Sequence, residues 1–137
     1  MPLPKQKFRE IVYLALFSLD TGGETEDDIV NLIMEELKVT KKQGHEGFRK
    51  ALKIYELKEE LDKKVAEGST EYELDRIPFV EKNILRMGVF ELFHENEVPP
   101  LVAIAEAIRL SRKFSSPESS SFVNAVLDTL HKKYGRE

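Results

Sequence analysis

Residues 115–128 read SSPESSSFVNAVLD and predict the start of a helix, the last one in the chain. Ser116 is an N-cap residue, and Pro117 suits the first helical position, where no backbone N–H is needed. Glu118 puts a negative charge in the first turn, where the helix dipole favours it. Capping explains one serine and one glutamate, but it explains neither Asn124 nor the remaining serines.

The apolar residues that follow lie on one arc of this helix, and Gly135 offers a stop. The same helical spacing recurs along the whole chain, and no convincing alternating strand pattern appears. We therefore predict an all-α fold, a compact bundle of about seven helices.

Caps and breakers predict where these helices lie. In chain order we expect a helix over 5–19, then a helix capped by Thr25 with a stripe of Ile29, Leu32, Ile33 and Leu37. A long helix carrying Phe48 through Val65 and ending at Gly68 follows, and then a short helical turn through Tyr72 and Leu74. The remaining helices run from Pro78 to about His94, through Leu101, Ala105 and Ile108 to about Phe114, and from Pro117 onward.

The 137 residues are 41% hydrophobic and 34% charged, a composition typical of one soluble globular domain, here residues 1–137. The chain has no cysteine, which excludes disulfides and thiolate metal sites and fits a reducing cytoplasm. A net charge of -4 argues against a protein that coats nucleic acid over its whole surface. Any nucleic-acid contact would therefore need a local basic patch.

The N-terminal segment resembles a signal peptide only in part. Lys5, Lys7 and Arg9 precede an apolar run over 11–17, but Glu10 interrupts the positive charge and no small-residue cleavage site follows. No other segment approaches the roughly 20 apolar residues that span a bilayer. We interpret the segment as the amphipathic first helix of a cytosolic protein that has no membrane contact.

Motifs for catalysis, metal binding or cofactor binding do not appear. His45, His94 and His131 lack the spacing that sets two imidazoles on one helical face. There is no nucleophile elbow and no glycine-rich phosphate loop. Glu35 and Glu36 are helix neighbours that diverge by about 100°, so they indicate a solvated face rather than an acid–base pair. We expect no enzymatic activity, no cofactor and no metal.

Two clusters of basic residues occur in this chain, although its net charge is negative. They are Lys5, Lys7 and Arg9 in the first helix, and Arg109, Arg112 and Lys113 just before Phe114. Cations and helix N-termini hold phosphates and an exposed ring stacks on a base, so one interpretation is a single-stranded RNA surface. The other is a solvated cationic face with Phe114 in the core, and spacing alone leaves both open.

A series of short motifs lies in the order and spacing of a known family. They are VEKNILR over 80–86, EL over 91–92, VP over 98–99, VAIxEAI over 102–108, KF over 113–114 and FVNxVLD over 122–128. On these motifs the chain resembles the transcription antitermination factor NusB family. The N-terminal half matches more loosely, through RE over 9–10 and ALF over 15–17.

The resemblance implies two small helical subdomains packed as one domain. It also implies binding of boxA, a single-stranded RNA element of ribosomal RNA transcripts, jointly with NusE, a small-subunit ribosomal protein, in the antitermination complex of RNA polymerase. Carried over by position, the RNA side would use Lys5, Lys7, Arg9, Phe17, Glu81, Phe114 and Glu118. Ser119 and Asn124 match the family's RNA-facing helix start, and the second basic cluster adds Arg112 and Lys113.

Some positions depart from the family's pattern. Residues 118–121 (ESSS) have hydroxyls where two basic or imidazole side chains are usual, and Pro100-Leu101 replaces a typical Tyr-Lys pair. Each lost cation removes a phosphate contact, so we expect modest RNA affinity alone and greater reliance on NusE. The alternative is a helical protein-binding adaptor, or a self-associating dimer, without independent RNA binding. Monomer and homodimer both stay open for the isolated chain.

Overall fold

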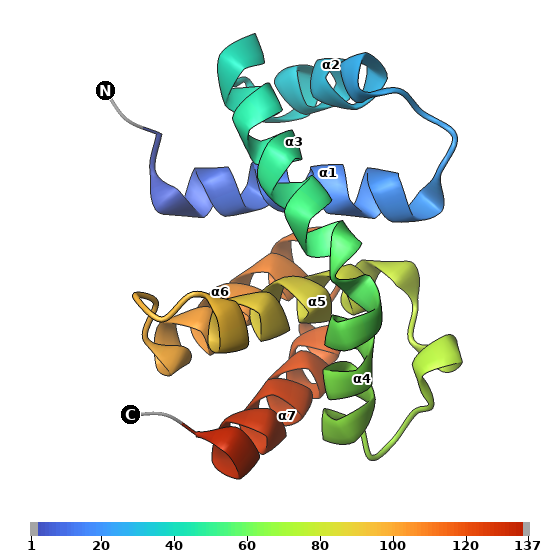
Figure 1. Ribbon diagram of the computed structural model, residues 1–137, viewed down its shortest axis with the longest axis vertical. Coiled ribbons are helices and arrows are strands. Elements are labelled where there is room, and N and C mark those ends of the chain that lie inside the picture. The colour runs from blue at the N-terminus through green and yellow to red at the C-terminus, as the bar shows by residue number, and fades with distance from the viewer. Residues whose placement is uncertain (1–2, 136–137) are drawn as a thin grey trace. The chain divides into compact units, whose positions relative to one another are not determined.

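The computed structural model describes residues 3–135, and over that range it contains seven α-helices, one 3-10 helix and no strand (Figure 1). The predicted all-α class is confirmed. The elements are α1 (Lys5–Thr21), α2 (Glu26–Leu37), α3 (Lys41–Glu56), α4 (Lys58–Gly68), η1 (Leu74–Arg76), α5 (Phe79–His94), α6 (Pro100–Phe114) and α7 (Pro117–Tyr134).

The chain divides into two compact units, a first unit that ends at Glu56 and a second unit that begins at Leu57. The predicted long helix through Phe48 and Val65 is wrong, because α3 ends at Glu56 and α4 begins at Lys58. Leu57 has φ −96° and ψ 10°, which lies outside the helical range. Both helices bury an apolar stripe, so the spacing continues across the break and periodicity does not reveal it.

In the first unit, α1 packs against α2 and α3. The predicted cap of α2 is confirmed: the Thr25 hydroxyl accepts from the Asp28 N–H at 3.1 Å, and the Thr25 N–H donates to the Asp28 carboxylate at 3.3 Å. Helices α1 and α3 approach so closely that a Cβ at Gly47 would lie 2.2 Å from the side chain of Ile11. This contact fixes which side of α1 is buried within the unit.

In the second unit, α5 packs against α4, α6 and α7 and is buried continuously from Asn83 to Leu92. An added Cβ at Gly88 would lie 2.8 Å from the Leu127 side chain, so glycine lets α5 approach α7. Gly68 ends α4 as predicted. Position 68 also packs tightly on α7, since an added Cβ would lie 2.7 Å from a backbone oxygen of α7.

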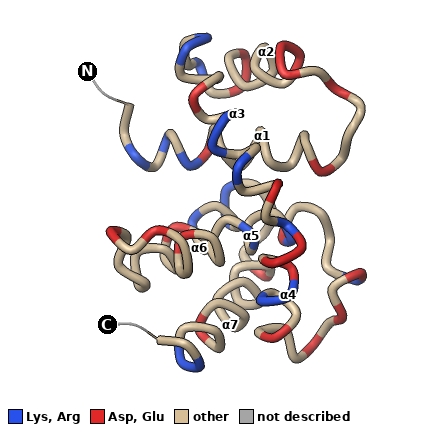
Figure 2. The backbone as a smooth tube through the Cα atoms, viewed as in Figure 1, with Lys and Arg blue, Asp and Glu red and all other residues tan. Residues whose placement is uncertain are grey.

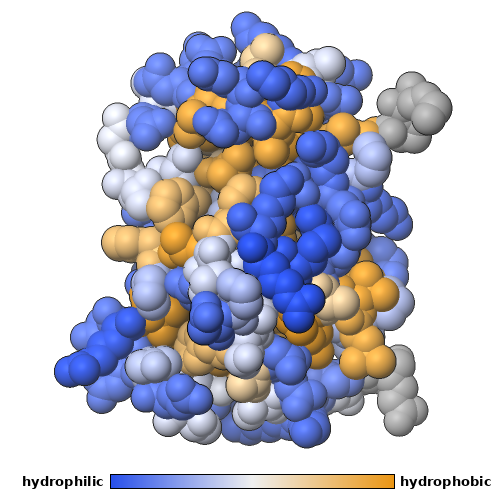
Figure 3. All heavy atoms as spheres, turned by 180° about the vertical axis from the view of Figure 1, so that it is seen from behind, coloured by the Kyte–Doolittle hydropathy of each residue, from blue (hydrophilic) through white to orange (hydrophobic). Residues whose placement is uncertain are grey.

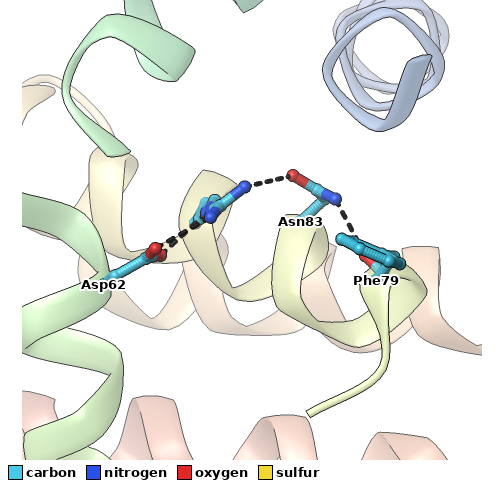
Figure 4. Close-up of polar contacts among 4 residues, drawn as sticks. Asp62, Phe79 and Asn83 are labelled. Carbon is cyan, nitrogen blue, oxygen red and sulfur yellow. Dashed lines mark hydrogen bonds and ion pairs between the residues drawn. The ribbon is translucent and has the colours of Figure 1, made fainter. Parts of the chain in front are cut away.

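A buried ionic network holds the start of α5. The Arg86 guanidinium donates to both carboxylate oxygens of Asp62, at 2.7 and 2.8 Å, and to the Asn83 side-chain oxygen at 3.0 Å. Asn83 in turn donates to the backbone oxygen of Phe79 at 2.9 Å (Figure 4). Arg86 is only 4% exposed, so its charge depends on these partners for compensation. The network ties α4 to α5 and reaches the first turn of α5 through Asn83.

The structure corrects the expected buried face of α6. Leu101 is 71% exposed, whereas Ala103, Ile104, Ala107 and Leu110 are buried. Alanines allow α6 to pack closely against α5 and α7, so the buried stripe includes them and leaves Leu101 at the surface. Hydrophobic residues do reach the surface among hydrophilic ones, as Figure 3 shows for one face of the molecule.

Candidate nucleic-acid interface

The first candidate patch lies at the start of α1, where Figure 2 shows Lys and Arg near the N-terminal end of the helix. Lys5 is exposed, while Lys7 and Arg9 are half-buried. The Lys7 ammonium lies 3.8 Å from the carboxylate of Glu10, a residue that is only 5% exposed. The cations thus come immediately before the point at which α1 becomes buried.

Helix geometry brings two of the three cations together. Lys5 and Arg9 are four residues apart, so they lie one above the other on the same side of α1. Lys7 is two residues from each of them, which turns it by about 200° to the opposite side of the helix. A single stretch of RNA backbone can therefore touch Lys5 and Arg9 together, and Lys7 belongs to another side.

Two further residues in the first unit bear on this patch. Phe17 is half-buried, its ring centroid lies 6.3 Å from that of Tyr13, and it follows Lys5 by about 18 Å along the axis of α1. Lys50, which was not predicted from the sequence, comes from α3 and has its ammonium 5.9 Å from the centroid of the Phe8 ring. No local signal marks Lys50, because only the packing of α3 on α1 brings it near the basic turn.

The second candidate patch, in the second unit, begins at the end of α6. Arg112 and Lys113 are exposed in its last turn, where cations interact favourably with the helix dipole. Arg109 instead donates to Glu106 at 3.0 Å, which compensates its charge. Phe114 is half-buried, between the two extremes expected for a core residue and a free stacking ring, and the Lys113 ammonium lies 5.8 Å from its centroid.

Local hydrogen bonds explain most of the serines at the start of α7. Ser116 is the N-cap and accepts from the Ser119 N–H at 3.3 Å, as predicted. The hydroxyl of Ser119 donates back to the Ser116 backbone oxygen at 2.9 Å, and the buried Ser120 donates to the Pro117 backbone oxygen at 2.6 Å. Ser121 is exposed. The hydroxyls of Ser116, Ser119 and Ser120 thus stabilise the first turn of α7.

Ser115 has a long-range partner. Its hydroxyl donates to the carboxylate of Glu81 at 2.5 Å, across 34 residues of sequence, and joins the α6–α7 loop to the start of α5. Glu81 is only 7% exposed. In contrast, Glu118 and Asn124 are exposed, and within residues 3–135 the Asn124 side chain makes no hydrogen bond. Asn124 therefore does not hold the serine loop, and its amide is available to a partner.

Two of the three histidines pair with carboxylates. His45 lies 2.7 Å from Glu26, and His94 lies 2.6 Å from Glu60. Over the described residues, no group of three His, Asp or Glu side chains is arranged to hold a metal ion. Between residues 3 and 135, no helix is long and apolar enough to cross a membrane.

The sequence and the structure are similar to those of known all-helical proteins. A model of the NusB family matches residues 6–132. The transcription antitermination protein NusB of Dehalococcoides mccartyi is 32% identical over 132 residues, which cover 96% of this chain and 92% of that protein. T. maritima NusB has a TM-score of 0.77 at 28% identity, covering 99% and 96% of the two chains. A crystal structure of antitermination factors NusB and NusE in complex with dsRNA matches with a TM-score of 0.73 at 26% identity, covering 95% and 97%.

Proposed function

The chain belongs to the NusB family, and we propose from this premise that it is a transcription antitermination factor. It binds boxA-type single-stranded RNA of ribosomal RNA transcripts jointly with NusE, and the assembly promotes processive transcription by RNA polymerase. The observation that carries the proposal is the family match along nearly the whole chain. The similar structure that contains NusB, NusE and dsRNA supports both partners. The protein acts in the cytoplasm, with transcription, and catalyses no reaction itself.

In the first unit, Lys5 and Arg9 bind phosphates of the RNA. Both side chains lie on the same side of α1, which supports this assignment. They can bind neighbouring phosphates of one RNA segment and release the counterions held there. Lys7 makes a weaker phosphate contact, since Glu10 already offsets part of its charge. The half-buried Phe17 offers one ring face to a base.

In the second unit, Phe114 stacks on a base. Its partial exposure supports this role, since one part of the ring is held by the protein while another reaches solvent. Arg112 and Lys113 are exposed beside it and bind phosphates. At the start of α7, Ser119, Asn124 and Glu118 form neutral or acceptor hydrogen bonds to RNA groups. Glu81 belongs to the same patch through its bond to the α6–α7 loop.

NusE supplies what this chain lacks. The serines at the start of α7 are uncharged and donate to backbone oxygens, and the Lys7 charge is partly offset by Glu10. The heterodimer therefore binds RNA more tightly than the chain does alone. By thermodynamic linkage, RNA raises the affinity for NusE by the same factor.

An electrophoretic mobility shift with boxA-type RNA, with and without NusE, tests the function. The expected result is weak binding by the chain alone and much tighter binding by the heterodimer. A permuted RNA of the same length and composition is the control for purely electrostatic binding. Binding to NusE without any effect of RNA would instead support a protein-binding adaptor. Loss of RNA binding with rising protein concentration would support a dimer that hides its RNA surface.

A further inference from the structure

The hydrogen bond between Ser115 and Glu81 joins two segments that are distant in the sequence, so helix capping and helix geometry do not require it. Glu81 is the third residue of α5, and its carboxylate accepts the Ser115 hydroxyl at 2.5 Å. Within residues 3–135, the Glu81 side chain makes no other hydrogen bond. A carboxylate that is 7% exposed loses much of its hydration, so a donor that compensates it contributes strongly.

The bond holds a very short loop. Only Ser115 and Ser116 separate the end of α6 from the start of α7. Phe114 directly precedes Ser115, and the N-cap Ser116 directly follows it. Fixing Ser115 to α5 therefore restricts both the ring on one side and the first turn of α7 on the other.

Resting on the proposed RNA-binding function, we infer that Ser115 and Glu81 act together as positioning residues for RNA. Glu81 acts through the Ser115 hydroxyl and does not itself contact the RNA. The pair orients Phe114 for stacking and keeps the start of α7 in register with it.

A direct contact between Glu81 and RNA fits the geometry less well. The carboxylate has little exposed surface, and its accessible lone pairs are partly used by Ser115. Its negative charge would also repel a phosphate, so only a base N–H donor could approach it. Ser115, in contrast, is exposed and stands between the two proposed RNA-binding elements.

A double-mutant cycle with boxA-type RNA and the NusE heterodimer tests the inference. We expect Ser115→Ala and Glu81→Ala each to weaken RNA binding by about tenfold, and the double variant to be no weaker than either single one. Ser115→Thr and Glu81→Gln retain a donor and an acceptor and should restore binding. Ser121→Ala changes an exposed serine of α7, is the matched control and should bind as the wild type does.

Two other patterns would overturn the inference. If Glu81 contacts RNA directly, Glu81→Ala loses binding while Ser115→Ala does not. If the bond serves only general stability, both variants lower the melting temperature and the NusE affinity together with RNA affinity, and Ser115→Thr gives no selective rescue. Absence of RNA binding by the wild-type heterodimer would overturn the proposed function itself.

A measurement without RNA separates these failures. Hydrogen exchange of the Ser119 amide, which donates to the Ser116 cap, should be faster in Ser115→Ala and Glu81→Ala than in Ser121→Ala. Unchanged exchange would show that the bond does not order the start of α7, whatever the RNA result.

Discussion

The N-terminal halves of α1 and α5 both carry charged residues, but they differ in how deeply those residues are buried. At α1, Lys5 stands in solvent and Arg9 is half-buried on the same side of the helix. In α5, Glu81 and Arg86 are buried, and they bond to Ser115 in the α6–α7 loop and to Asp62 in α4. The charged residues of α1 are thus exposed or half-buried, whereas those of α5 are buried, and burial is the main difference between the two helices.

The same difference in burial decides whether removing a charge mainly changes folding stability or mainly changes binding affinity. A buried, hydrogen-bonded charge is costly to leave unpaired, so its removal affects folding. An exposed cation contributes little to folding, and its removal affects binding in a salt-dependent way. Variants of buried and of exposed charges should therefore differ in which of the two properties they change.

Arg86→Ala should lower the free energy of unfolding by about 3–5 kcal/mol, because it leaves the Asp62 carboxylate without its buried partner. Urea titration measures the effect. Arg112→Ala removes an exposed arginine of the same unit and should change stability by no more than about 0.5 kcal/mol. Similar losses in both variants would remove the distinction between buried and exposed charge.

The Lys5→Ala/Arg9→Ala double variant should lose RNA affinity and reduce the slope of log K against log salt by up to about 1.4, at about 0.7 per phosphate contact on a single strand. Lys7→Ala should reduce the slope by about half as much at most, because Lys7 lies on the opposite side of α1 and pairs with Glu10. Fluorescence titrations at several salt concentrations measure both. A larger effect of Lys7→Ala would reverse the assignment of the two sides.

Phe114→Ala should weaken RNA binding by about 1–3 kcal/mol if the ring stacks on a base. Because Phe114 is half-buried, its stability loss should stay below the roughly 3–5 kcal/mol of a core phenylalanine. Thermal melts paired with RNA titrations separate the two effects. Phe79→Ala, a ring that is 50% exposed at the start of α5, is the control and should retain RNA binding. A large drop in the melting temperature of Phe114→Ala would refute stacking.

The smallest effect concerns an exposed cluster of the second unit. A hydrogen bond from the Tyr134 hydroxyl, followed by one from the Lys133 ammonium at 3.1 Å, lowers the pKa of Glu67 below its usual value of 4.5. Since the folded-state pKa is depressed, this contribution to stability is present above pH 4.5 and is lost as the pH falls through the folded-state pKa. NMR titration of the Glu67 carboxyl in Tyr134→Phe should give a higher pKa than in the wild type. An unchanged pKa would show that the tyrosine bond does not form in solution.

Local signals predicted much of the fold and part of the candidate site. The cap at Thr25, the cap at Ser116 and the end of α6 at Phe114 are all confirmed, because each depends on residues within one helical turn. The break at Leu57 and the exposure of Leu101 were not predicted. Periodicity reports that a helix has an apolar side, and it does not report which neighbour covers that side.

The serines show the same distinction between contacts within one helical turn and contacts between distant segments. Those of Ser116 and Ser119 follow from helix capping and first-turn geometry within a few residues. The role of Ser115 depends on Glu81, which lies 34 residues away. Lys50 likewise joins the first patch only through the packing of α3 on α1.

The sequence by itself determined the all-α class, most helix limits, the basic turn at Lys5 and Arg9, and the family, because these depend on short-range spacing and on ordered motifs. Only the tertiary structure decided that Arg86 is paired with Asp62, 24 residues away, and that Glu81 is occupied by Ser115. The physical reason is that burial and partnership depend on which helices pack together. That is a property of contacts between distant segments, and the same charged residue can lie in water or in the core without any change in its local sequence.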